Sequence, residues 1–314
     1  MTQGCPGAIL GISDDAKAIR GFVEEAAHQV DPVVLMGEPG TGKQLAARLI
    51  HEGSSRREGP FIMLDCSLYY ERELRRELFG YHHEGEDGEA HKGLLEFAAH
   101  GTCYLSRIEE ISPSIQQSLL HFLEHGSFQR LGDGKETPSG VRLVVSSDKN
   151  LKGFVDAGLF DLSLYEALSR LSACFCPLRE RKEDIPCMVD FMVDNFTAIH
   201  GGKEKISFSP EAFEALKAYP WPLNFDELEK EILRLLEAGL KTVRCENLAM
   251  EISSFWIGQR GDPEVRKVIE ELDGCIREFK VMSRLHAGLG EDVSGWDPWA
   301  LLPSWPQRDF IGEP

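Results

Sequence analysis

The fold is decided by the stretch Gly37-Glu38-Pro39-Gly40-Thr41-Gly42-Lys43-Gln44. Apolar residues 33–36 precede it and a helical pattern, residues 44–50, follows it, so the order is strand, glycine-rich turn, helix. In that order the glycines allow a tight turn whose N–H groups face phosphate oxygens, and the helix N-terminus adds partial positive charge. Lys43 would reach the β- and γ-phosphates. We therefore take all eight residues as candidate nucleotide-binding residues.

One position of this loop departs from the usual pattern. Gln44 stands where a serine or threonine commonly binds Mg²⁺. The loop therefore predicts ATP or ADP as the ligand, with a weak or absent contribution from Mg²⁺. The alternative that stays open is a turn that has kept the pattern and lost the nucleotide.

Composition narrows the classes of function. The 314 residues carry a net charge of −18, which argues against direct binding of nucleic acid. No apolar run approaches the roughly 20 residues that a membrane span requires, and we see no secretory signal, so we expect a cytoplasmic protein. The eight cysteines are scattered and include no C-x-x-C pair, so we expect reduced, buried thiols and no metal site. Residues 81–92 contain three histidines but read as an exposed, solvated loop.

Strand and helix patterns alternate through the first half of the chain. The apolar runs predicted as strands are residues 33–36, 61–64, 103–105, 141–145 and 173–176. Alternation of this kind predicts an α/β fold with a doubly wound parallel sheet. From residue 179 to about 256 we find only helical patterns. We therefore expect a nucleotide-binding α/β part over 1–178, a small helical part over 179–256, and a helical then Trp/Pro-rich tail over 257–314.

Four further motifs carry a family resemblance. They are Glu77-Leu78-Phe79-Gly80, Pro177-Leu178-Arg179-Glu180-Arg181, Asp184-Ile185-Pro186 and Tyr219-Pro220-Trp221-Pro222. With the phosphate loop, they make residues 8–256 resemble the AAA+ domain of bacterial enhancer-binding proteins, the ATP-driven activators of sigma-54 RNA polymerase. The loop GEPGTGKQ is similar to that family's GESGTGKE, which also lacks Ser or Thr after the lysine. The resemblance implies a P-loop AAA+ sheet followed by an α-helical lid.

The same resemblance implies that the residues for ATP hydrolysis have been replaced. The family's LFLDE corresponds to residues 103–107, CYLSR, so serine and arginine stand in place of the acidic pair. An arginine cannot act as a base. The family's sensor asparagine, its two arginines that reach a neighbouring subunit, and its lid arginine are also replaced. The degenerate positions are Ser106, Arg107, Asp148, Asp161, Ala167 and Asp226, with Asp65 in place of a further family asparagine. We therefore name no catalytic residue.

Nearby residues could replace the missing acidic pair and one of the missing arginines. Glu109 and Glu110 lie just downstream of the replaced acidic pair, but their offset from the strand end is expected to direct them elsewhere. Arg170 could replace an arginine that reaches across subunits only if the backbone shifts.

The contact loop is altered as well. The family's polymerase-contacting GAFTGA corresponds to residues 85–90, GEDGEA, which are acidic and lack the aromatic residue and the threonine. We therefore expect a regulatory protein-binding module that binds nucleotide without hydrolysing it. The partner classes are an active sigma-54 activator or a polymerase component, and a homo-hexamer is disfavoured. The tail tryptophans, Trp296, Trp299 and Trp305, are candidates for a docking role. The alternatives are an active ATPase that drives sigma-54 transcription and a structural module that binds no nucleotide.

Overall fold

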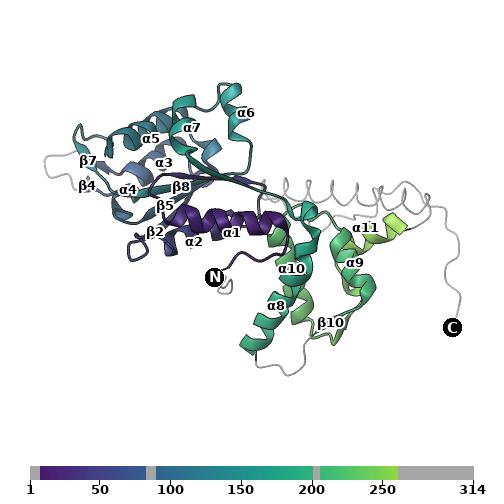
Figure 1. Ribbon diagram of the computed structural model, residues 1–314. Helices are drawn as coiled ribbons and strands as arrows, with labels where there is room; N and C mark the ends of the chain where they lie inside the picture. Colours follow the sequence, from purple (N-terminus) through teal and green to yellow (C-terminus); the bar gives the residue numbers. More distant parts are fainter. Residues whose placement is uncertain (1–7, 83–89, 201–205, 261–314) are drawn as a thin grey trace, which may run out of the picture. The chain divides into compact units, whose positions relative to one another are not determined.

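A five-stranded parallel sheet forms the centre of the protein (Figure 1). The computed structural model describes residues 8–82, 90–200 and 206–260. The strand order is β2 (Phe61–Asp65), β5 (Thr102–Ser106), β8 (Arg142–Ser147), β1 (Val33–Gly37) and β9 (Leu171–Phe175). Each of the five predicted apolar runs falls within or overlaps one of these strands. The predicted α/β fold with a parallel sheet is thus confirmed.

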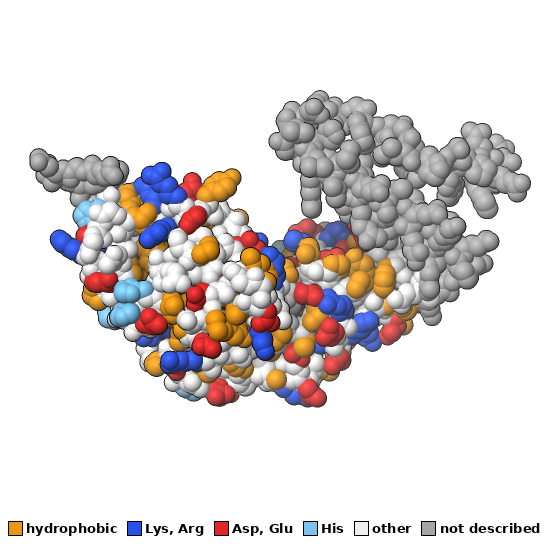
Figure 2. Space-filling view, turned by 90° about the horizontal axis from the view of Figure 1, so that it is seen from above, with side chains coloured by type: hydrophobic (Ala, Val, Ile, Leu, Met, Phe, Trp, Pro, Cys, Tyr) orange, Lys and Arg blue, Asp and Glu red, His pale blue; other side chains and the backbone are white. Residues whose placement is uncertain are grey.

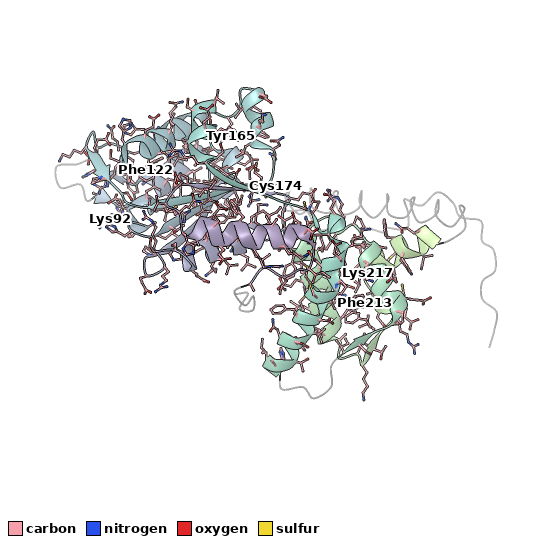
Figure 3. The ribbon with its side chains drawn as sticks, in the orientation of Figure 1. Lys92, Phe122, Tyr165, Cys174, Phe213 and Lys217 are labelled. Carbon is pink, nitrogen blue, oxygen red and sulfur yellow. The ribbon has the colours of Figure 1, made fainter. Side chains whose placement is uncertain are left out.

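The sheet is covered on both faces, and neighbouring strand residues point to opposite sides. Val33 and Leu35 pack with α1 (Asp14–Ala27) and α2 (Lys43–Glu52), whereas Val34 faces the other side. That side is covered by α3 (Glu71–Phe79), α4 (Leu94–Phe97), α5 (Pro113–His125), α6 (Leu151–Asp156) and α7 (Leu162–Leu168) (Figure 1). Phe122 of α5, labelled in Figure 3, belongs to this second core.

The parallel register brings the carboxyl ends of the strands to one edge of the sheet. Met36 of β1 lies opposite Ser147 of β8, and Asp65 of β2 lies opposite Ser106 of β5. Ligands of open α/β sheets bind at this edge. The phosphate loop follows β1 there, so the fold places the degenerate positions that follow β5 and β8 at the same edge as the loop.

Short antiparallel pairs of strands lie outside the central sheet in the first part of the chain. β3 (Tyr81–His82) pairs with β4 (Ala90–His91), so the stretch expected to be only an exposed loop begins and ends in a two-stranded ladder. β6 (Ser127–Gln129) and β7 (Glu136–Pro138) form a hairpin that is connected by residues 130–135. The expected GEDGEA contact loop lies, except for Ala90, outside the described residues.

The helical region follows the sheet. α8 (Ile185–His200) and α10 (Asn224–Glu237) belong to the same compact unit as the sheet. A second unit contains α9 (Pro210–Ala218) and α11 (Met250–Arg260), and Figure 3 labels Phe213 and Lys217 on α9. The expectation of helices alone is wrong in one detail, because β10 (Ser207–Phe208) pairs with β11 (Thr242–Val243). The overall order, a parallel P-loop sheet followed by a helical lid, is as predicted.

Local sequence explains the helix starts, but the cysteines differ from expectation. The Ser13 hydroxyl accepts a hydrogen bond from the Ala16 amide and caps α1, and Ser209 caps α9 in the same way. Cys66 and Cys103 are buried as expected, whereas Cys174 at the edge strand β9 is exposed. Edge position leaves one side of that strand uncovered. Within the described residues, every helix is too short or too polar to cross a membrane.

Candidate nucleotide-binding site

The phosphate loop joins β1 to α2 in a conformation that requires glycine. Gly40 has φ +73°, and a Cβ there would lie 2.1 Å from the backbone oxygen of Leu223. Gly42 also has a positive φ, +102°, directly before α2 begins. The Thr41 hydroxyl donates to the Glu38 carbonyl oxygen at 2.7 Å and closes the turn. The local sequence thus builds the phosphate-binding geometry that the motif predicts.

Lys43 is held inside this turn. Its Nζ donates to the carbonyl oxygens of Gly37 and Glu38 at 2.6 and 2.8 Å. It also forms an ion pair with Asp148 Oδ1 at 2.9 Å. An ammonium group has three protons, so these three contacts use all of its donors. The structure therefore brings together the predicted phosphate-binding lysine and one of the degenerate positions.

Two arginines from later in the chain bind the outer side of the loop. Arg179 Nη1 and Nη2 donate to the two Glu38 carboxylate oxygens at 2.7 and 2.6 Å, and this pairing lowers the pKa of Glu38. Arg181 Nη2 donates to the Thr41 carbonyl oxygen at 3.1 Å. Both arginines belong to the PLRER motif. The motif is therefore connected directly to the nucleotide loop.

Asn224, the first residue of α10, completes this fastening. Its Nδ2 donates to the Pro39 carbonyl oxygen at 2.8 Å, and its Oδ1 accepts from the Leu178 amide at 2.7 Å. Asn224 is fully buried and has φ +51°, a conformation that asparagine tolerates better than most residues. The Phe225 amide donates to the Gly40 carbonyl oxygen at 3.0 Å. The beginning of α10 therefore packs on the tip of the phosphate loop.

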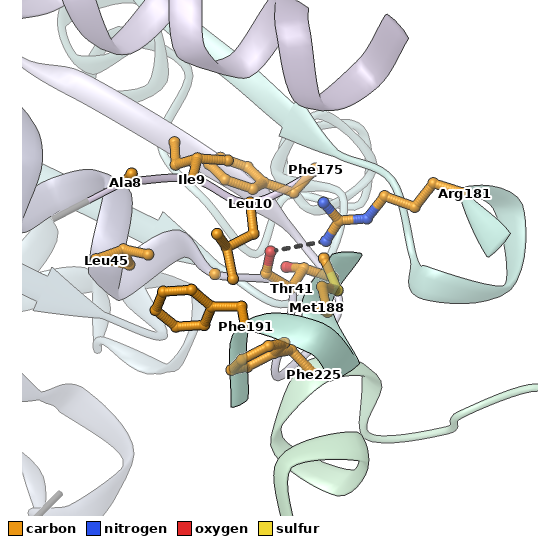
Figure 4. A pocket seen from close by; sticks show the side chains of 11 residues that line it. Ala8, Ile9, Leu10, Thr41, Leu45, Phe175, Arg181, Met188, Phe191 and Phe225 are labelled. Atoms are coloured by element: carbon orange, nitrogen blue, oxygen red, sulfur yellow. Dashed lines mark hydrogen bonds between the residues drawn. The ribbon is translucent and has the colours of Figure 1, made fainter. Parts of the chain in front are cut away.

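An apolar pocket lies beside the loop, and Figure 4 shows the side chains around it. Its lining is Ala8, Ile9, Leu10, Thr41, Gly42, Leu45, Phe175, Arg181, Met188, Phe191 and Phe225. A mostly apolar pocket with three aromatic rings, next to a phosphate-binding turn, suits the flat base of a nucleotide. Of these residues, sequence reasoning named only Thr41 and Gly42 as ligand-binding, because the others come from separate segments of the chain. Among those others, Arg181 belongs to the PLRER motif that sequence analysis singled out.

The two positions that replace the acidic pair differ in their contacts. Arg107 follows β5 in a left-handed conformation, φ +54°. Its Nε donates to Asp65 Oδ1 at 2.8 Å, and its Nη2 contacts the other Asp65 oxygen. Ser106 Oγ has only a long contact, 3.5 Å, with the Leu64 carbonyl oxygen. Two degenerate positions on neighbouring strands, Arg107 and Asp65, therefore form an ion pair with each other.

Glu109 lies next to the degenerate position Asp148. It lies in the 3-10 helix η2 (Ile108–Glu110), is buried, and its Oε1 accepts a hydrogen bond from the Asp148 amide at 3.1 Å. The other downstream acid, Glu110, pairs with Lys149. The prediction that neither acid replaces the missing pair stays a prediction. In the structure, Glu109 fixes the segment that carries Asp148.

The other degenerate positions have structural roles or open surroundings. Asp161 caps α7, accepting from the Leu164 amide at 2.9 Å, and Ala167 is half-buried on the same helix. Arg170 pairs with Asp31 at 3.2 Å. Asp31 precedes β1, so Arg170 lies at the sheet edge opposite to the phosphate loop. Asp226 is exposed in the first turn of α10.

Comparison with known proteins agrees with this geometry. Residues 9–173 match the family described as the Sigma-54 interaction domain, and residues 179–255 match the AAA+ ATPase lid domain. The chain belongs to the sigma-54 interaction domain family. The match covers both the sheet and the helical region that fastens the phosphate loop.

Curated relatives of this sigma-54 interaction domain are transcription regulators. The Nif-specific regulatory protein of Herbaspirillum seropedicae is 36% identical over 229 residues, 72% of this chain and 42% of that protein. The anaerobic nitric oxide reductase transcription regulator NorR of Aeromonas salmonicida is 31% identical over 293 residues, 92% of this chain and 56% of that protein. The chain spans about half the length of these relatives.

Solved structures of a further relative resemble the fold. NtrX from Brucella abortus in complex with ADP has a TM-score of 0.72 and 27% identity, covering 95% of this chain and 68% of that one. NtrX in complex with ATP has a TM-score of 0.70 and 30% identity, covering 91% and 67%. The chain and NtrX therefore share the same fold.

Proposed function

We propose that this sigma-54 interaction domain binds ATP or ADP without hydrolysing it and works as a regulatory module that binds another protein. The observation that carries the proposal is the ion pair between Arg107 and Asp65. It occupies the carboxyl end of β5, the strand whose end carries the family's acidic pair.

Binding is supported by the geometry of the loop and the pocket. The loop residues 37–44 keep the glycine conformations of a phosphate-binding turn, and α2 begins at Lys43. The apolar pocket beside Thr41 and Leu45 offers a place for the base. NtrX, which shares the fold, binds both ADP and ATP in its crystal structures. We propose the same ligands here, at the same loop.

Mg²⁺ contributes little to binding in this proposal. Mg²⁺ in nucleotide sites is held by carboxylate or hydroxyl oxygens together with the phosphates. Gln44 offers an amide and Ser106 an uncharged hydroxyl, while the nearby Asp65 is paired with Arg107. The chain therefore lacks a free carboxylate at the two positions where the family motif would supply Mg²⁺ ligands.

Hydrolysis requires a group that positions the attacking water and cations that stabilise the transferring phosphoryl group. Arg107 cannot accept a proton. Asp161 and Ala167 stand at the positions of the family's arginines, and Arg170 is engaged with Asp31 at the opposite sheet edge. Each such loss costs orders of magnitude in rate, so their combination predicts turnover at background.

The partner is proposed to be another protein. Acidic and basic side chains are interspersed on the face seen in Figure 2, with hydrophobic side chains between them. The net charge of −18 favours a partner with a basic surface, and we propose an active sigma-54 activator or a polymerase component in the cytoplasm. The tryptophan-bearing tail, which lies outside the described residues, is proposed to contribute to docking.

Binding and turnover assays on the purified chain test the proposal. We expect calorimetric binding of ATP or ADP that Lys43→Ala abolishes, and no phosphate release above background. The double variant Ser106→Asp/Arg107→Glu is expected to stay inactive, because the arginines at 161 and 167 are still absent. Robust hydrolysis by the wild type, lost in Lys43→Ala, would favour the active-ATPase alternative. Absence of binding to either nucleotide would favour the purely structural one.

A further inference from the structure

We propose that the Asp148 carboxylate makes this site select ADP over ATP. The inference rests on the proposed nucleotide binding and adds the discrimination between the two ligands. Asp148 Oδ1 lies 2.9 Å from Lys43 Nζ, and the two side chains are 24% and 8% exposed. A fixed negative charge thus touches the cation that a nucleotide's terminal phosphate must reach.

The competition follows from the donors of Lys43. All three of its protons are used, by two loop carbonyl oxygens and by Asp148. In a phosphate loop the backbone N–H groups cradle the α- and β-phosphates, while the lysine reaches the β- and γ-phosphates. The β-phosphate of ADP therefore has backbone donors besides Lys43. The γ-phosphate of ATP depends on the lysine that Asp148 already neutralises.

Hydrogen bonds to the backbone around Asp148 hold its carboxylate close to Lys43. Its amide donates to Glu109 Oε1 at 3.1 Å, and the adjacent turn is closed by Ser147 Oγ, which donates to the Lys149 carbonyl oxygen at 2.8 Å. Glu109 is buried, and its other carboxylate oxygen has no hydrogen-bond partner. Two carboxyl groups are therefore held close to the end of β8, where the added negative charge of a γ-phosphate is disfavoured.

Compensating cations are scarce at this edge. Gln44 and Ser106 are poor ligands for the Mg²⁺ that would offset the triphosphate charge, and the Arg107 guanidinium is paired with Asp65. The third phosphate consequently adds repulsion without adding a new attractive contact. Binding of ADP does not depend on these residues, because the backbone N–H groups of the loop and Lys43 contact its phosphates.

The test is isothermal titration calorimetry of the full chain with ADP and with ATP, each with and without Mg²⁺. We expect the wild type to bind ADP at least about tenfold more tightly than ATP. Asp148→Asn keeps the shape of the side chain and removes its charge, so it should tighten ATP binding about tenfold and bring the two affinities together. As a control, Asp156→Asn removes one charge from an exposed side chain at the end of α6 and should leave the ratio unchanged.

The outcomes separate this inference from the proposed function. Equal wild-type affinities for ADP and ATP overturn the selectivity while nucleotide binding stands, and this measurement needs no variant. A preference for ADP that persists in Asp148→Asn overturns the role of Asp148. If the wild type binds neither nucleotide and Asp148→Asn binds both alike, Asp148 blocks the loop and does not discriminate. If neither protein binds either nucleotide, the proposed function fails and the selectivity with it.

Discussion

A fully buried carboxylate, Asp184, joins the segment before α1 to the segment before α8. Its oxygens accept hydrogen bonds from the Ile12 amide, the Ser13 amide and the Ser13 hydroxyl at 2.6, 2.7 and 2.7 Å. The segment that it holds continues from Ile9 and Leu10, two residues of the apolar pocket. One side chain therefore supports both the stability of the fold and one wall of the candidate base pocket.

Asp184→Ala is expected to lower the free energy of unfolding by about 3 kcal/mol, because it leaves buried donors without an acceptor. Chemical denaturation measures this change. The control is Asp190→Ala, an exposed aspartate of α8, which should change the free energy by less than about 0.5 kcal/mol. Similar effects of the two variants would show that the Asp184 hydrogen bonds add little.

At the scale of elements, the phosphate loop is held by pieces that come much later in the chain. η3 (Leu178–Glu180) supplies Arg179 to Glu38, and the start of α10 supplies Asn224 to Pro39. Rigid placement of a binding loop reduces the ordering cost of binding. We therefore expect the helical region to contribute to nucleotide affinity through the loop as well as through Phe225 in the pocket.

Asn224→Ala tests this contribution. The variant loses the hydrogen bonds to Pro39 and Leu178 at a buried position, so we expect a stability loss of about 1–3 kcal/mol and nucleotide binding weakened roughly tenfold. The matched control is Asn150→Ala, which removes the cap of α6. It should cost about 1 kcal/mol of stability and leave the affinity unchanged. Equal affinities in both variants would contradict a role for α10 in positioning the loop.

At the scale of the whole molecule, we propose that charge disfavours self-assembly. Copies with a net charge of −18 repel one another, and Asp161 puts a carboxylate where the family has an arginine directed at a neighbour's nucleotide. Asp161 is also committed to capping α7. In this proposal, the positions that carry the family's arginines do not supply the attractive contact that shared nucleotide gives to a ring of identical subunits.

We expect light scattering to find a monomer or small oligomer, with ATP or ADP present or absent. Because salt screens exposed charges beyond about 10 Å at 0.1 M and about 3 Å at 1 M, raising the ionic strength should not by itself produce a ring if the missing arginine contacts are decisive. A stable hexamer with either nucleotide would contradict the proposal. A hexamer that forms only at high salt would show that net charge, and not Asp161, opposes assembly.

Local chemistry accounts for what could be predicted without the fold. The run 33–36 is apolar at every position because β1 is buried on both faces, and glycine at 37, 40 and 42 reflects backbone conformations set within the turn. Ser13 and Ser209 could be recognised as caps for the same reason, since a cap bonds to an amide three residues away. Strand, loop and helix starts are short-range features, and their signal lies within a few residues.

The ion pairs at the candidate site, in contrast, join residues that lie far apart in the sequence. Lys43 meets Asp148, Asp65 meets Arg107, and Glu38 meets Arg179, at separations of 105, 42 and 141 residues. These meetings depend on the strand order β2-β5-β8-β1-β9, in which β1 lies beside β8 although two other strands of the sheet, β2 and β5, come between them along the chain. Residue type and periodicity do not encode which strand lies beside which. Ion pairs and pocket walls between distant segments are therefore set by packing of the whole sheet and of the helices that cover it.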